Sequence, residues 1–148
     1  MVSEVDESAG REMQMLQQYL NEFSQRAEIL GRQLEMIEQR RFESLAAIET
    51  LGAIKENREE TVLLPIGGGA SLRVKVVDPE SILLDIGSDV TVARDNPHSI
   101  DFLQDRIREM EAMAQKLNAS IQQIQTQANE VVRRIEAAYQ QAQPYKGQ

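Results

Sequence analysis

Cysteine and tryptophan are absent from this sequence of 148 residues, and histidine occurs once, as His98. Without cysteine the chain can form neither a disulfide nor a thiolate metal site, and a single histidine cannot build a zinc centre alone. Aromatic residues make up only 4% of the chain, which does not suit a thick globular core. The apolar residues are mainly leucine, isoleucine, valine, methionine and alanine, and they predict a thin core.

The sequence also lacks long apolar runs and an excess of positive charge. No stretch of about 18 apolar residues occurs, so no membrane span is expected. The opening MVSEVDESAG is acidic and has no apolar segment of the kind found in signal peptides, which predicts a cytoplasmic protein. With 24 acidic and 16 basic residues the formal net charge is −8, which argues against nucleic-acid binding.

The first part of the chain, residues 9–57, is predicted to form one long helix. Its apolar residues recur at alternating spacings of three and four, which is typical of a coiled coil. These residues are Met13, Leu16, Leu20, Phe23, Ala27, Leu30, Leu34 and Ile37. Arg41 occupies the next core position, and we expect the pattern to resume at Leu45 and Ile48 after a stutter. Gly31 is interpreted as a tolerated defect, with a flexible point as the alternative.

A second long helix is predicted for residues 96–142, with Asn96 as its N-cap and Pro97 as its first helical residue. Its seam is uninterrupted from Ile100 to Ala142. Residues 1–8 and 143–148 are expected to be flexible. Because the two seams have similar lengths and share one connector, we predict a single-domain antiparallel coiled-coil hairpin. A parallel homodimer of either helix is the alternative.

The connector, residues 61–94, changes to a period of two, as in SLRVKV at 71–76, which indicates half-buried strands. Turn sequences GGG at 67–69, DPE at 78–80 and GSD at 87–89 separate four short strands. The fold class is therefore mainly α with a small β region of two tandem β-hairpins.

The three consecutive glycines raise the question of a phosphate-binding loop. Such a loop needs Lys-Ser or Lys-Thr after its glycines and then a helix, whereas here Ala70-Ser71-Leu72 and a strand follow. The glycines Gly67, Gly68, Gly69 and Gly87 are instead predicted to supply positive φ angles in hairpin turns. No cofactor and no catalytic residue are expected, and His98 is interpreted as a surface or capping residue.

Two short hairpins cannot bury much surface, and their edges are open. We therefore predict that the strands form an oligomerisation surface from which the coiled coil projects. The residues predicted to form this surface are Leu64, Ile66, Leu72, Val74, Val76, Ile82, Leu84, Ile86, Val90 and Val92.

This arrangement resembles the α-type subunits of the prefoldin family of chaperones, over roughly residues 10–140. The most specific part is LLPIGGGASLRVKVVDPESILLDIGSDVTVARD, because the α-type subunits carry two hairpins and the β-type subunits carry one. The resemblance implies a hexamer of two α-type and four β-type subunits whose hairpins build a β-barrel platform. It also implies six coiled coils whose ends hold unfolded client proteins and pass them to a group II chaperonin without ATP.

On that resemblance, the client-binding surface is expected at the free ends of the two helices. Exposed apolar residues, including flexible methionine, suit unspecific binding. The residues predicted to bind clients are Met13, Met15, Leu16, Tyr19, Leu20, Val132, Ile135, Tyr139 and Tyr145. The alternatives are a structural coiled-coil adaptor and a prefoldin-like subunit of another complex that transfers no clients.

Overall fold

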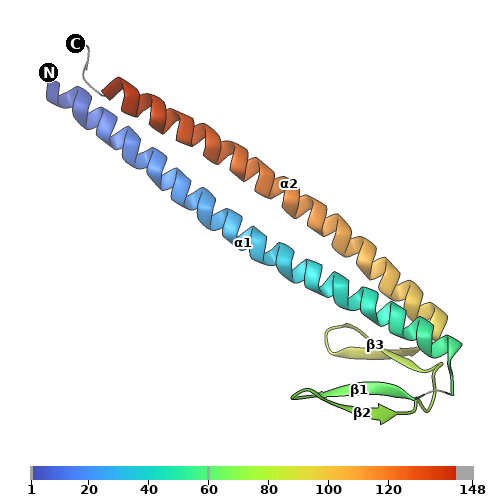
Figure 1. Ribbon diagram of the computed structural model, residues 1–148. Coiled ribbons are helices and arrows are strands. Elements are labelled where there is room, and N and C mark those ends of the chain that lie inside the picture. Colours follow the sequence, from blue (N-terminus) through green and yellow to red (C-terminus); the bar gives the residue numbers. More distant parts are fainter. Residues whose placement is uncertain (1, 60, 143–148) are drawn as a thin grey trace. The chain divides into compact units, whose positions relative to one another are not determined.

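The computed structural model describes residues 2–59 and 61–142, and it confirms the predicted fold class (Figure 1). Two long helices flank two small antiparallel hairpins. In chain order the elements are α1 (Val2–Glu56), β1 (Val62–Gly67), β2 (Ala70–Val74), β3 (Ile82–Gly87), β4 (Val90–Arg94) and α2 (Asn96–Ala142). Neither described helix contains a segment apolar enough, over the length required, to span a membrane.

Helix α1 begins at Val2 and not at residue 9, so the expectation of a flexible segment up to residue 8 is wrong for residues 2–8. No proline or glycine precedes Gly10 to interrupt the helix. Glu4 in the first turn also favours a helix, since a negative side chain interacts well with the positive end of the helix dipole. The predicted flexible segment 143–148 lies outside the described residues.

The described chain divides into two units. The first, which we call the helical unit, comprises the residues of α1 up to Ile37 and those of α2 from Met113 onward. Its buried apolar residues include Leu16, Ala114 and Ile124. Arg26 and Leu30 of α1 line one groove of about 270 Å³ together with Ile124 and other residues of α2. The two helices therefore face each other within this unit, and they run in opposite directions (Figure 1).

The second unit, which we call the hairpin unit, comprises Glu38–Ala112. Within it, the expectation about which residues of α1 occupy the core positions is wrong. Ser44 and Leu51 of α1 are buried, whereas Leu45 is 44% exposed. The seam thus runs without a stutter through Arg41, Ser44, Ile48 and Leu51, at spacings of three and four. Serine is tolerated at this position because its hydroxyl donates a hydrogen bond of 2.9 Å to the Arg40 carbonyl oxygen.

Arg41 lies half-buried at the predicted core position and is held there by charge. Its guanidinium forms an ion pair of 2.9 Å with Glu38, one turn away on α1. A longer contact of 3.7 Å reaches Glu111 of α2. A polar residue at a core position favours one helix register, because it finds its partner at one level only.

The two hairpins have the same construction, twenty residues apart in the sequence. In the first, Val62 pairs with Val74 and Gly67 with Ala70. In the second, Ile82 pairs with Arg94 and Gly87 with Val90. Each first strand has a register shift just before its turn, between Pro65 and Gly67 or between Asp85 and Gly87. The sequences LLPIG and LLDIG occupy equivalent positions in this internal repeat.

Both hairpins turn through two residues with positive φ, the combination that type I′ turns require. The angles are 59° and 79° at Gly68 and Gly69, and 52° and 60° at Ser88 and Asp89. Glycine adopts such angles without strain, and aspartate tolerates them better than most residues.

Strand β2 ends at Val74, so the prediction that Val76 belongs to the strand is wrong. Val74 pairs with Val62, the first residue of β1, and no strand residue remains opposite Val76. The chain instead enters the turn at residues 78–81, where the Ser81 N–H donates to the Asp78 carbonyl oxygen at 3.2 Å.

We predict that Gly31→Ala stabilises the protein by about 1 kcal/mol, because alanine has the higher helix propensity. No atom lies within 4 Å of the position that its Cβ would occupy. Thermal unfolding followed by circular dichroism would measure the change. The matched control Gly68→Ala also has free space but a φ of +59°, and it should cost roughly 1–2 kcal/mol. A destabilising Gly31→Ala would instead indicate that the glycine is needed.

Candidate functional site

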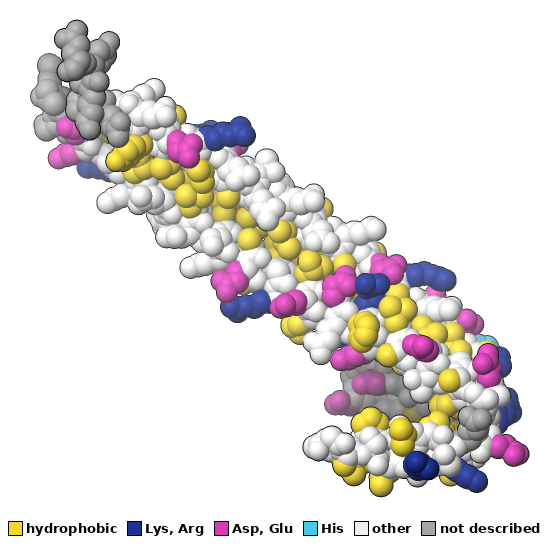
Figure 2. Space-filling view, in the orientation of Figure 1, with side chains coloured by type: hydrophobic (Ala, Val, Ile, Leu, Met, Phe, Trp, Pro, Cys, Tyr) yellow, Lys and Arg dark blue, Asp and Glu magenta, His cyan; other side chains and the backbone are white. Residues whose placement is uncertain are grey.

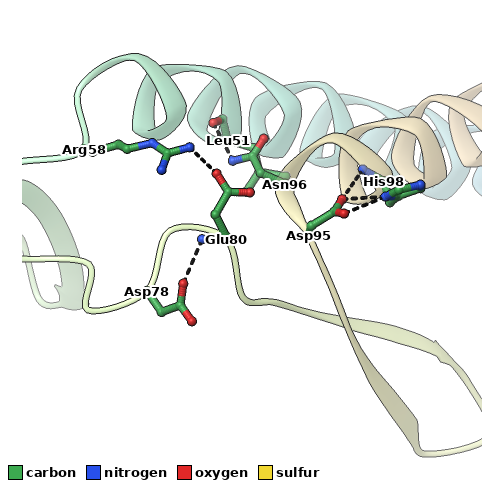
Figure 3. A network of polar contacts seen from close by, with 7 residues as sticks. All are labelled: Leu51, Arg58, Asp78, Glu80, Asp95, Asn96 and His98. Atoms are coloured by element: carbon green, nitrogen blue, oxygen red, sulfur yellow. Dashed lines mark hydrogen bonds and ion pairs between the residues drawn. The ribbon is translucent and has the colours of Figure 1, made fainter.

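The first candidate surface is the β region, and polar contacts within the hairpin unit fix its attachment to the helices (Figure 3). Arg58, just after α1, forms an ion pair with Glu80, in the turn between the two hairpins. The Glu80 N–H also donates a 3.1 Å hydrogen bond to the Asp78 carboxylate, which closes that turn. The end of α1 and the connection between the hairpins are therefore tied together.

The N-cap of α2 is Asp95, not Asn96 as predicted. The Asp95 carboxylate accepts a hydrogen bond of 2.8 Å from the His98 N–H, which is the third helical residue. The His98 ring nitrogen Nδ1 lies 2.7 Å from the same carboxylate. These contacts lower the pKa of Asp95 below its ordinary value of 3.8, chiefly through the hydrogen bond from the His98 backbone. Charge on the carboxylate therefore stabilises the start of α2.

Asn96 is fully buried, and its side chain links the two helices. Its Nδ2 donates a hydrogen bond of 3.0 Å to the Leu51 carbonyl oxygen of α1. Its Oδ1 accepts no hydrogen bond from the residues that the structure describes. Ser99 is also fully buried, and its hydroxyl donates to the Asp95 carbonyl oxygen at 2.7 Å. The start of α2 is thus anchored on the last turns of α1.

The second hairpin is held on α2 by Arg106. Its Nη2 donates a hydrogen bond of 3.0 Å to the Asp85 carbonyl oxygen in β3. The same guanidinium lies 4.9 Å from the centre of the Phe102 ring, a distance that allows a cation–π contact. Leu84, the neighbour of Asp85, is only 7% exposed. One face of the second hairpin is therefore covered by the chain itself.

The first hairpin is much less covered. Leu64, which occupies the position equivalent to Leu84, is 49% exposed. Ten residues are predicted to form the oligomerisation surface. Leu84 is buried, and four of the ten are half-buried, namely Val74, Val76, Ile82 and Val92. The other five are exposed, namely Leu64, Ile66, Leu72, Ile86 and Val90.

Two strand residues that the prediction omitted are more exposed than those it named. Leu63 is 67% and Leu83 72% exposed. Each belongs to a run of consecutive apolar residues, VLLPI at 62–66 or ILL at 82–84, in which both faces of the strand carry apolar side chains. The unbroken succession of apolar residues is the sequence signal for these two exposed leucines, because a strand with one face in solvent alternates apolar and polar residues.

The second candidate surface lies in the helical unit, toward the start of α1 and the end of α2. Figure 2 shows hydrophobic side chains along the visible face of the helices. Among the predicted client-binding residues, Leu16 is buried, which indicates packing between the helices. Three are half-buried, namely Met13, Leu20 and Ile135. Four are exposed, namely Met15, Tyr19, Val132 and Tyr139, and Tyr145 lies outside the described residues.

No group of three or more histidine or acidic side chains that could hold a metal ion occurs within residues 2–59 and 61–142. The two candidate surfaces are instead suited to binding other polypeptides. They combine exposed apolar strands and exposed apolar helix surface, both of which suit contacts with other polypeptides.

Comparisons with known proteins agree with one another. The family model described as Prefoldin subunit matches residues 16–141. A protein from Methanoculleus marisnigri named Prefoldin subunit alpha is 53% identical over 138 residues, which cover 93% of each chain. A protein of the same name from Methanoregula boonei is 47% identical over 131 residues, covering 88% of this chain and 86% of the relative.

Among solved structures, a cryo-EM structure of filamentous PFD from Methanocaldococcus jannaschii has a similar fold, with a TM-score of 0.67. The match covers 80% of this chain and 98% of the other, at 16% sequence identity. At that identity the similarity bears on the fold alone.

The lowered pKa of Asp95 predicts a pH dependence of stability. Because the folded-state pKa lies below 3.8, the contribution of the carboxylate is present above pH 4 and is lost as the pH falls through the lowered pKa. Asp95→Asn should keep a capping side chain but remove the titrating group. Urea unfolding of both proteins between pH 6 and pH 2 should show a stability difference that shrinks in acid. A difference that stays constant across this range would contradict the assignment.

Proposed function

This chain belongs to the prefoldin family, as an alpha-type subunit, and from that premise we propose that it serves as one subunit of an ATP-independent chaperone. The whole chain would act as one prefoldin-like domain in the cytoplasm, with two working surfaces. The strands would join it to companion subunits, and the free ends of the helices would hold unfolded polypeptides. The observation that carries the proposal is the family match over residues 16–141.

Assembly is supported by the exposure of the strands. Five of the ten predicted oligomerisation residues are exposed in the isolated chain, and burying each on assembly would contribute on the order of 1–2 kcal/mol. The relatives are named as subunits, and the similar solved structure is a filamentous PFD. We therefore propose a hetero-oligomer with β-type subunits, in the ratio of two to four, built on a β-barrel of paired hairpins.

Client binding is supported by exposed apolar side chains near the free helix ends. Met15 is 53% and Tyr139 62% exposed, although α1 and α2 pack together along their seam. One such end would bind weakly. Several ends on one extended client would bind far more strongly, because every contact after the first is intramolecular. Release then requires only a competing receptor, which we propose to be a group II chaperonin.

No nucleotide or other cofactor enters this mechanism. The three glycines at 67–69 form a turn between two strands, whereas a phosphate loop leads into a helix. We accordingly propose no catalytic role for the chain. A structural adaptor would share the assembly surface but would show no binding of unfolded protein.

We predict that the double substitution Met15→Ser and Tyr139→Ser weakens protection of a denatured model protein several-fold, because it removes apolar surface at the free ends. Light scattering during dilution of the denatured protein, in the presence of the assembled complex, would measure the effect.

The matched control is Ile29→Ser with Met36→Ser, which changes two side chains that are each 55% exposed but lie further along α1. The control should protect as well as the unchanged chain. Equal protection by all three complexes would contradict binding at the helix ends. Absence of protection even by the unchanged complex would favour the adaptor.

A further inference from the structure

A second line of residues at core-like spacing runs along α1 in the helical unit. Its members recur at alternating spacings of four and three, as the core positions of a coiled coil do. All of them are exposed, namely Met15, Tyr19, Glu22, Arg26, Ile29, Gln33 and Met36. We call this line the second seam. Because four of its residues are large and apolar, it has the pattern of a helix face that packs on another helix.

The second seam borders the groove between α1 and α2. At about 100° per residue, it lies roughly 110° around α1 from the buried seam that contains Leu16. Arg26, which belongs to the second seam, lines the groove of about 270 Å³ together with Gln123 and Gln127 of α2. A helix that packed on the second seam would therefore also contact α2.

The second seam carries two opposite charges at its centre. Its four apolar side chains are each between 44% and 55% exposed. Glu22 and Arg26 lie between them, one helical turn apart, and neither forms an ion pair within the described parts of the chain. A row of exposed apolar side chains with this charge pattern can both attract a partner helix and orient it.

We propose that the second seam of one copy packs on the second seam of another copy of this chain, in antiparallel order. The twofold axis lies at the level of Ser24, so residues equally far before and after Ser24 face each other. Glu22 of each copy then faces Arg26 of the other, and Tyr19 faces Ile29. The contact uses residues of the helical unit only, and no residue of the hairpins takes part in it.

A second copy is the occupant that the charges favour. It supplies an arginine opposite Glu22 and a glutamate opposite Arg26 at the required spacing, so the same ion pair forms twice. A parallel pair would instead place Glu22 beside Glu22 and Arg26 beside Arg26, which would repel. An isologous pair of this kind is closed, because each second seam accepts one partner.

The contact would cover Met15 and Tyr19, two of the residues predicted to bind clients. This consequence rests on the proposed function, whereas the contact itself does not. Four apolar side chains from each copy make a small interface, so the pair should be weak and reversible. It should form in concentrated solution and be absent from the dilute solutions in which protection of a denatured protein is measured. An unfolded client that binds the same side chains would separate the two copies.

A spin label at residue 24 tests the contact directly. The chain has no cysteine, so Ser24→Cys provides one labelling site in each copy, and every label pair joins two copies. Ser24 lies roughly 200° around α1 from both Glu22 and Arg26, so the label does not enter the contact. Double electron–electron resonance on the concentrated full chain, alone and with β-type subunits, should show a distance of roughly 20–30 Å across the paired helices.

Charge reversal then tests the pairing through rescue. Glu22→Arg alone places two basic residues at each ion-pair position, and Arg26→Glu alone places two acidic ones. Either variant should lower the fraction of labels at the short distance roughly tenfold, because two attractions become two repulsions. Mixing the two variants restores opposite charges at both positions and should restore the fraction. The double variant Glu22→Arg with Arg26→Glu should also pair with itself.

Glu35→Arg is the matched control, since Glu35 is also exposed on α1 but lies roughly 220° around the helix from Glu22. It should leave the fraction unchanged. Absence of the short distance in the unchanged chain, its persistence after a single reversal, or loss without rescue would overturn the contact. A chain that pairs through the second seam but joins no β-type subunit would contradict the proposed function and leave the contact standing.

Addition of a denatured model protein tests the consequence for clients. The fraction of labels at the short distance should fall several-fold, because Met15 and Tyr19 cannot contact a client and a second copy together. An unchanged fraction in the presence of bound denatured protein would show that clients bind elsewhere, and would overturn the proposed competition.

Discussion

A two-stranded sheet cannot cover either of its own faces, and this constraint determines which apolar side chains of the hairpins are exposed. Each hairpin has apolar side chains on both faces, because the runs VLLPI at 62–66 and ILL at 82–84 place consecutive apolar residues on a strand. The chain covers one of the four faces, where Leu84 is buried in the hairpin that Arg106 holds on α2. The remaining apolar surface is exposed in the single chain, and we propose that companion subunits cover it on assembly.

The two helices pack together along their seam, and apolar side chains near their ends remain exposed. Within the hairpin unit the seam includes Arg41 and Ser44, both of which satisfy their polar groups locally. The Asn96 side chain and the Asp95 cap then fix where α2 begins relative to the last turns of α1. Polar contacts thus define the register, while apolar packing supplies most of the attraction between the helices.

Periodicity was sufficient to predict the helices, the four strands and the fold class, because the change from a period of 3.5 to a period of two is a local property. It failed where a polar side chain took an apolar position. The pattern of apolar residues favours Leu45 over Ser44 as a core residue, whereas Ser44 is buried and its hydroxyl donates a hydrogen bond to the Arg40 carbonyl oxygen. Asn-Pro is a common helix start, so the sequence favours Asn96 over Asp95 as the N-cap. Which face of which hairpin is covered depends on Arg106, twenty-one residues from Asp85, and no local pattern reveals it.

Hydrogen exchange can test whether assembly covers the first hairpin, since it reports the protection of each backbone amide. The amide exchange of the free chain should be compared with that of the chain bound to the β-type subunits that we propose as its companions. We expect a large gain in protection in the first hairpin, residues 62–74, and a smaller gain in the helix seam around Leu16, which is already buried in the free chain. Equal exchange of the first hairpin in the free and the bound chain would contradict the claim that assembly covers it.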